Sequence, residues 1–186
     1  GWFYNLGITG LRAQLVADHP KALLIKYVFP KSPAEGHVQI GDLIVGAGGQ
    51  LFQQPHRNGY GERVFGADGP ISELAQVLEE CQGADGKGKL ALTLRRGGER
   101  KRVVLNVGQK YGSYAATYPG GCAKSDKILA ELLEYIAKHQ QENGSFGDPV
   151  DNTFAPLALL ASGDAKYRPA IERNVRWHGR ETRPND

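Results

Sequence analysis

The 186-residue sequence contains no methionine, and its two cysteines, Cys81 and Cys122, lie far apart without a CxxC or Cys/His spacing. This scarcity argues against a structural zinc site and a dense disulfide framework, while a single disulfide remains open. No apolar run approaches the roughly 20 residues of a membrane-spanning helix, and no basic and apolar leader is visible. Because the chain begins with Gly1 and lacks methionine, we expect it to be a piece of a longer protein.

Blocks of like charge are also missing. The 23 basic and 20 acidic residues are interspersed, and the formal net charge is only +3. Such a balance argues against a nucleic-acid-binding or membrane-binding surface. A hydrophobic content of 40% is enough for a real core. The composition therefore predicts a soluble globular protein.

The first part of the chain, to about residue 107, has mostly the pattern of β-strands. Three short apolar runs, at residues 22–29, 43–45 and 90–94, predict buried strands. The glycine-bearing turn at 95–100 predicts a hairpin with the next apolar run. One helix is expected between Pro70 and Gly83, and residues 50–69 are expected to form an exposed loop.

The pattern changes after residue 107. Residues 108–123 read as a linker, and three helices are expected in residues 124–186. Ser125 is the expected N-cap of the first helix, which should run to about residue 141. The second, at 153–161, is so rich in Ala and Leu that we expect it to be buried nearly all round, with Gly163 ending it. The third should open near Pro169. The predicted fold class is α+β.

Several segments in the first part resemble a PDZ domain of the DegP-type periplasmic proteases. They are NLGI at 5–8, VFPKSPAEG at 28–36, IGDLI at 40–44, the helix from Ile71, and KLALTLRRGG at 89–98. The segments occur in the order of that family. The resemblance implies a small β-barrel or sandwich with a flanking helix over residues 1–107. In the IGDLI segment we expect Gly41 and Asp42 to form a turn with a structural role.

The resemblance also implies a binding site for an extended peptide, whose C-terminal carboxylate would accept hydrogen bonds from the amides of Leu6, Gly7 and Ile8. The peptide would lie as an extra strand beside residues 8–10. On the helix, Leu74 and Val77 should face the core and the other apolar positions the groove. The expected peptide-binding residues are Asn5, Leu6, Gly7, Ile8, Thr9, Gly10, Ile71, Ala75 and Leu78.

The helical part resembles the first repeat of an α/α-toroid of the terpene-cyclase and prenyltransferase type. The segment that carries this resemblance is YIAKHQQENGSFG at 135–147, where Gln140, Gly144 and Phe146 match the repeat pattern. The resemblance implies that Gln140 caps backbone groups and that Phe146 packs on the next repeat. Together, both halves resemble a large exported bacterial family, a domain of unknown function. That likeness implies a periplasmic or secreted location.

No Ser/His/Asp order, nucleophile elbow or metal-ligand spacing is visible, so we expect no catalytic residue, metal or cofactor in this sequence. The leading hypothesis is a non-catalytic interaction module that binds a protein or peptide C-terminus, or the remainder of its own chain. One alternative is a regulatory or substrate-recruiting fragment of a larger exported enzyme. Another is a purely structural module whose groove is filled by residues 50–69 or 108–121.

Overall fold

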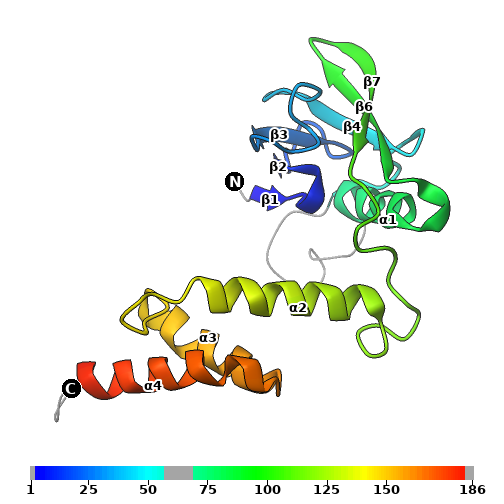
Figure 1. Ribbon diagram of the computed structural model, residues 1–186. Coiled ribbons are helices and arrows are strands. Elements are labelled where there is room, and N and C mark those ends of the chain that lie inside the picture. Colours follow the sequence, from blue (N-terminus) through cyan, green and yellow to red (C-terminus); the bar gives the residue numbers. More distant parts are fainter. Residues whose placement is uncertain (1–2, 57–68, 183–186) are drawn as a thin grey trace. The chain divides into compact units, whose positions relative to one another are not determined.

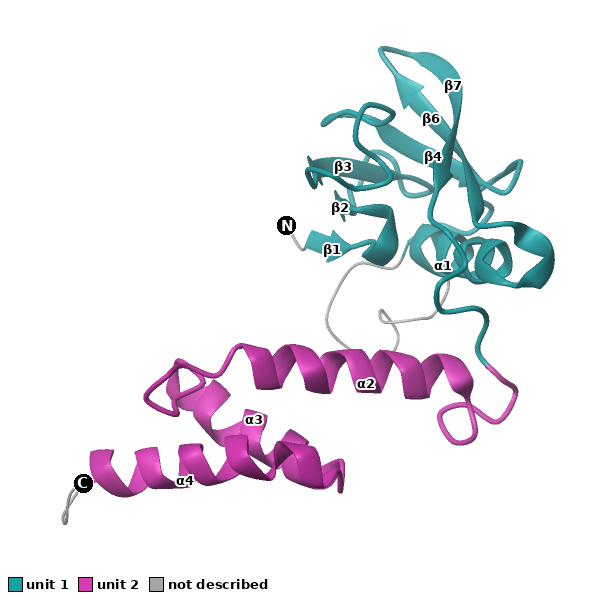
Figure 2. Ribbon diagram, viewed as in Figure 1, with its two compact units in different colours: residues 1–114 teal, residues 115–186 magenta. Residues whose placement is uncertain are grey.

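The computed structural model describes residues 3–56 and 69–182 of the chain. These residues form two compact units, residues 1–114 (unit 1) and 115–186 (unit 2) (Figure 2). The division falls between Tyr114 and Ala115. Within the described residues, no helix is both long and apolar enough to cross a membrane.

Unit 1 contains an open, antiparallel sheet (Figure 1). The strand order is β1-β2-β3-β4-β6-β7, and β5 pairs with β4 beside this path. Apolar side chains alternate along the strands, as in β6, where Leu90, Leu92 and Leu94 are buried and the residues between them are not. The strands are β1 (Phe3–Asn5), β2 (Leu11–Gln14), β3 (Leu23–Val28), β4 (Leu43–Ala47), β5 (Gln50–Leu51), β6 (Lys89–Arg96) and β7 (Glu99–Asn106).

Helix α1 (Pro70–Gln82) packs against this sheet and is followed by the short 3-10 helix η2 (Ala84–Gly86). Pro70 lies in the first turn, where a missing amide is harmless, and Gly83 ends the helix. The three predicted strands, the hairpin and this helix are all confirmed. The expected loop at 50–69 is only partly correct, because β5 pairs with β4 across the Gly48–Gly49 turn; residues 57–68 of that loop lie outside the described residues.

The first half of the predicted linker is packed on unit 1. The side chain of Gln109 donates to the carbonyl of Gly83 at the end of α1, and the amide of Tyr114 donates to the carboxylate of Glu79. Residues 109–114 therefore lie against the C-terminal end of α1. This contact explains why the boundary between the units falls within the linker and not before it.

Unit 2 consists of helices α2 (Ala123–Lys138), α3 (Pro149–Ala161) and α4 (Arg168–Glu181), with the 3-10 helix η3 (Ala165–Tyr167) before α4. Ser125 is not the N-cap of α2 as predicted: Cys122 holds that position, and Ser125 lies inside the first turn. Cys81 and Cys122 are both buried and do not form a disulfide with each other. Gly163, with φ +69°, follows α3 as expected. The small core consists of Leu133, Phe146, Leu159, Tyr167 and Ala170.

Helix α3 is not buried nearly all round, contrary to the prediction. Leu159 and Asn152 are its buried residues, while four large apolar side chains lie at the surface of unit 2. The prediction took apolar composition as a sign of complete burial. Among the described residues, α3 packs mainly against α2 and α4, so it buries chiefly the face between these two helices. The exposed side chains are Val150, Phe154, Leu157 and Leu160.

Candidate functional site

The predicted carboxylate loop, residues 5–10, connects β1 to β2 (Figure 1). Residues Gly7–Thr9 form a 3-10 turn, so the expected extended segment at 8–10 is wrong and the strand begins only at Leu11. Thr9, which is fully buried, causes this: its hydroxyl donates to the Leu6 carbonyl at 2.9 Å and accepts from the Leu11 amide at 3.2 Å. A side chain that bonds its neighbouring backbone favours a turn over a strand.

Two glycines shape the loop for different reasons. Gly7 has φ +58° and Gly10 has φ +73°, both in the left-handed region that other residues rarely adopt. A Cβ on Gly7 would meet open space. A Cβ on Gly10 would instead lie 2.0 Å from the Cβ of Ser32, because the turn that contains Ser32 packs directly on the loop. Gly10 is therefore required by packing, whereas Gly7 leaves its backbone open to an approaching molecule.

Two of the three amides expected to bind a carboxylate already donate within the protein. The Leu6 amide donates to the Leu11 carbonyl at 2.9 Å. The Gly7 amide donates to Oδ1 of Asn5 at 3.0 Å, and the Asn5 side chain is exposed. An amide oxygen thus lies where a bound carboxylate oxygen was expected, and a ligand must replace it to reach the Gly7 amide.

The edge of β2 next to this loop is already paired. β1 runs antiparallel to β2, with Phe3 opposite Gln14 and Asn5 opposite Arg12, while β3 takes the other edge of β2. A peptide cannot add to β2 while β1 remains in place. Residues 50–51 and 109–114 belong to the two segments that were expected to fill the groove. Residues 50–51 pair with β4 and residues 109–114 lie on α1, so it is β1 that covers this edge.

The predicted helix residues of the site divide into two kinds. Ile71 and Leu78 are half-buried and pack against the same core as Ile8 of the loop, whereas Ala75 is exposed. Leu74 is buried, as predicted, and Val77 also packs against the core. The structure therefore brings the loop and the helix to one apolar core.

Near the start of β4 lies an ion pair that the sequence did not reveal. Arg96 forms two hydrogen bonds of 2.7 Å with the carboxylate of Asp42, which also accepts from the Gln39 amide at 2.8 Å. Burial raises the pKa of Asp42, but these hydrogen bonds lower it, and the net pKa lies below its ordinary value. The structural role predicted for Asp42 in the turn is confirmed. Only the partner, 54 residues away in the sequence, was missed.

In unit 2, Gln140 links the end of α2 to the start of α4. Its side-chain amide donates to the carbonyls of Gly144 at 3.1 Å and Ala170 at 2.8 Å, and its oxygen accepts from Arg173 at 2.6 Å. The prediction that Gln140 caps backbone groups is confirmed. Phe146 is buried within the core of unit 2 itself, so its packing on a further repeat stays a prediction.

A buried amide, Asn152, organises the loop between α2 and α3 and was also missed. Its oxygen accepts from the Phe146 amide at 2.8 Å and from Asn174 at 3.0 Å, and its nitrogen donates to the carbonyls of Gly147 and Asp148 at 2.9 Å. Asn152 and Asn174 are each only 1% exposed. Their only sequence signal was their polarity inside two otherwise helical patterns, which is a weak one.

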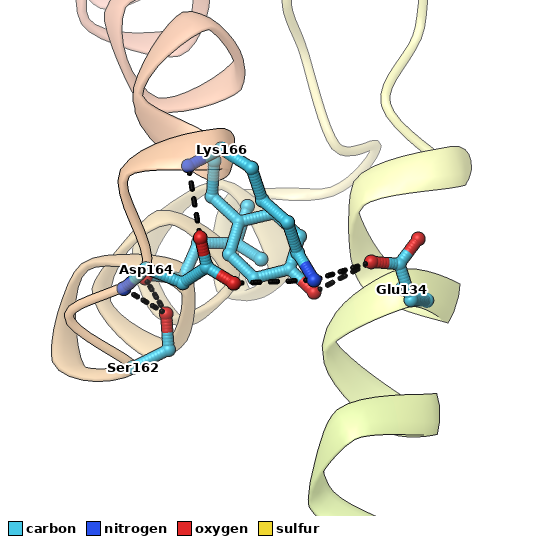
Figure 3. A network of polar contacts seen from close by, with 6 residues as sticks. Glu134, Ser162, Asp164 and Lys166 are labelled. Atoms are coloured by element: carbon cyan, nitrogen blue, oxygen red, sulfur yellow. Dashed lines mark hydrogen bonds and ion pairs between the residues drawn. The ribbon is translucent and has the colours of Figure 1, made fainter.

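A second polar cluster in unit 2 joins α2 to η3 (Figure 3). Lys166 Nζ lies 3.0 Å from Glu134 and 3.2 Å from Asp164, and the Tyr167 hydroxyl donates to Glu134 at 2.9 Å. Hydrogen bonding to Glu134 raises the pKa of Lys166, and hydrogen bonding to Lys166 lowers the pKa of Glu134. Lys166 is thus held in its charged form, which is not nucleophilic, and Glu134 is held as a carboxylate. The cluster is structural and not tuned for proton transfer near neutral pH.

No group of three or more His, Cys, Asp or Glu side chains within residues 3–56 and 69–182 is arranged to hold a metal ion. The described geometry thus offers backbone amides, apolar side chains and basic groups for binding. Comparisons with protein-family models, with curated proteins and with solved structures found no match for this chain.

Proposed function

We propose that unit 1 is a PDZ-type interaction module that binds an extended peptide through its free C-terminus, and that unit 2 is the first repeat of an α/α-toroid. The observation that supports the binding function most is the geometry at Gly7. Its backbone faces open space, and its amide donates to the exposed oxygen of Asn5. A terminal carboxylate can take over this hydrogen bond as a stronger, charged acceptor.

The direction of β1 supports a specific position for the peptide. β1 runs antiparallel to β2 and its C-terminal end leads into the loop. A peptide that pairs antiparallel with β2 and ends at the Gly7 amide runs in the same direction. The peptide therefore replaces β1, which is only three residues long, and β1 acts as an internal competitor. Ile71 and Leu78 favour an apolar side chain two residues before the peptide's end.

Fluorescence anisotropy with labelled peptides tests this function. Peptides with free C-termini should bind and their amidated counterparts should not. Removing residues 1–4 should strengthen binding by about tenfold or more, because the competing strand is gone. Tyr4→Ala is the matched control, since it removes the packing of Tyr4 on the core but keeps the strand backbone.

A substitution at Gly7 tests the loop itself. Gly7→Val places a Cβ on the open side of the loop and should weaken binding of free-acid peptides without unfolding unit 1. Gly97→Val is the matched control, because Gly97 has nearly the same conformation, φ +57°, and equally open surroundings, but lies in the β6–β7 turn. Equal loss of binding in both variants would contradict the assignment of the loop.

A second candidate is a purely structural role for unit 1, in which β1 stays in place permanently. The pairing of β1 with β2 favours it. This candidate predicts that no peptide binds to the wild-type protein or to the variant without residues 1–4. Binding that appears only in the shortened variant would support the displacement proposal instead.

A further inference from the structure

At the far end of β2 from loop 5–10, unit 1 has a pocket of about 540 Å³. It is formed by the segment between β2 and β3, by β4 and β5, and by the β6–β7 hairpin. The size is within the range of sites for small organic molecules. Because loop 5–10 precedes β2 and the pocket segment follows it, the pocket is separate from the proposed peptide site.

Two arginines of the pocket are direct cross-strand neighbours. Arg95 on β6 is paired in register with Arg100 on β7, so their side chains leave the same face of the sheet. Like charges opposite each other destabilise a sheet. Within the described parts of the chain, no ion pair joins Arg95, Arg100 or the nearby Lys21 to an acidic group. A bound anion would turn this unfavourable arrangement into a favourable one.

His19 holds one of these arginines in place. Nη2 of Arg95 lies 3.0 Å from Nδ1 and 3.3 Å from Nε2 of His19. A guanidinium has only donors, so the ring nitrogen that it contacts must be the unprotonated acceptor. The contact orients Arg95 without neutralising its charge, because an imidazole ring carries no negative charge.

The segment that carries His19 and Lys21 is fixed by backbone hydrogen bonds. The His19 amide donates to the Val16 carbonyl at 3.1 Å, and the Ala22 amide donates to the His19 carbonyl at 3.0 Å. From the other side, the His56 amide donates to the Pro20 carbonyl at 2.7 Å. The basic rim is therefore formed before any ligand arrives, which lowers the entropy that binding loses.

The inner wall of the pocket is apolar. Val45, Leu51 and Phe52 line it, and Phe52 is only 4% exposed. One carboxylate, that of Asp18, also borders the pocket, against the three basic side chains. The pocket thus combines an excess of positive charge at one side with a surface that favours a hydrocarbon or aromatic group.

We propose that this pocket binds a carboxylate attached to an apolar body. Arg95 and Arg100 hold the carboxylate, whose planar pair of oxygens matches the fork of a guanidinium. Lys21 adds charge at the rim, and the apolar body lies against Val45 and Phe52. Either a free small carboxylic acid or the C-terminal residue of a peptide has this chemistry.

Isothermal titration of the 186-residue chain with phenylbutyrate and with phenylbutanamide tests the proposal. The two probes share an apolar body and differ in charge. Phenylbutyrate should bind at least about tenfold more tightly than the amide, since a charge-assisted hydrogen bond to arginine is lost. Equal binding of both, or no binding of phenylbutyrate, would overturn the proposal. Inorganic phosphate should bind more weakly than phenylbutyrate; tighter binding of phosphate would also contradict the apolar part of the site.

Variants locate the site. Arg95→Gln and Arg100→Gln should each weaken phenylbutyrate binding by about tenfold. Lys89→Gln removes the same charge at the opposite, exposed end of β6 and should leave binding unchanged. An equal effect of Lys89→Gln would reduce the proposal to a general charge effect and overturn it. Circular dichroism checks that each variant is folded, and two-dimensional amide spectra should show shifts at Phe52 and Ala22.

The two sources of the carboxylate are separated by a competition experiment. If the pocket takes peptide C-termini, free-acid peptides should displace phenylbutyrate and lose affinity in Arg100→Gln. If it takes small acids, peptide binding should be unaffected by Arg100→Gln but weakened by Gly7→Val. The proposal for the peptide site and the proposal for the pocket can therefore be refuted independently of each other.

Discussion

Unit 1 buries most of its large aliphatic side chains, whereas unit 2 leaves many of them at the surface. The core of unit 1 includes Leu92 and Leu94 of β6, which are 1% and 0% exposed. In unit 2, Leu157 and Leu160 of α3 are 54% and 61% exposed, and the buried apolar core has only five residues among those described. What fixes the centre of unit 2 is instead a set of buried amides around Asn152. The comparison teaches that unit 1 is ordered by apolar burial and unit 2 by buried hydrogen bonds.

The strongest test of this difference between the units is to replace one leucine by alanine in each unit and to compare the losses of stability. Leu92→Ala should lower the free energy of unfolding of unit 1 by about 2–5 kcal/mol, because it leaves a cavity in a close-packed core. Leu160→Ala should change that of unit 2 by less than about 0.5 kcal/mol, because the side chain is at the surface. Hydrogen exchange read separately for each unit measures both. A similarly large loss for Leu160→Ala would mean that this face of α3 is covered in solution.

Unit 2 should instead be sensitive at Asn152. Asn152→Ala removes the acceptor of the buried Phe146 amide and of the buried Asn174 side chain, and one of the donors to the Gly147 and Asp148 carbonyls. We expect a loss of about 3 kcal/mol in the free energy of unfolding of unit 2, because several polar groups lose their hydrogen bonds. Thr153→Ala, at the exposed neighbouring position, is the control and should have little effect. Denaturation followed by the fluorescence of Trp177 measures both variants.

The same contrast explains which features the sequence could predict. The strands at residues 22–29 and 90–94 and the helix after Pro70 were found because period and turn residues are local signals. The exposure of α3 was missed because burial depends on how many neighbours a helix has. Similarly, the 3-10 turn at Gly7–Thr9 depends on the hydroxyl of Thr9, which a comparison of sequence segments does not weigh.

The candidate sites show the same limit. Loop 5–10 was recognised as a glycine-containing loop, but the pairing of β1 with β2 depends on strand register. The pocket with Arg95 and Arg100 was missed because its residues come from four separate segments. In sequence, Arg95 and Arg100 appear only as parts of a charged turn. That Arg95 and Arg100 lie opposite each other on neighbouring strands is visible only once the register of the hairpin is known.

The buried ion pair of unit 1 gives a smaller and pH-dependent effect. Asp42→Asn should lower the free energy of unfolding of unit 1 by about 1–2 kcal/mol at neutral pH, since Arg96 loses its charged partner but remains partly solvated. The pKa of Asp42 is lowered in the folded protein. Its contribution is therefore complete above the ordinary pKa of about 3.9 and is lost as the pH falls below that value.

Urea denaturation at several pH values measures this difference. The wild-type protein and Asp42→Asn should converge as the pH falls through the lowered pKa of Asp42. Asp85→Asn, an exposed change in the same unit, is the control for the removal of a carboxylate. A constant difference between the wild type and Asp42→Asn down to the lowest pH would show that the charge of Asp42 is not the cause.

The smallest effect is expected at the exposed cluster of unit 2. Glu134→Gln removes the carboxylate that contacts the exposed Lys166 (Figure 3) and accepts from the hydroxyl of the buried Tyr167. Because water and ions screen exposed charges, the variant should melt slightly below the wild type at low salt and together with it at about 1 M salt. Glu142→Gln, in the exposed loop after α2, is the matched control. Asp42→Asn should keep most of its effect at the same high salt, since its carboxylate is only 1% exposed. If both differences disappeared with salt, the two ion pairs would be equivalent, and burial would not distinguish the electrostatics of the two units.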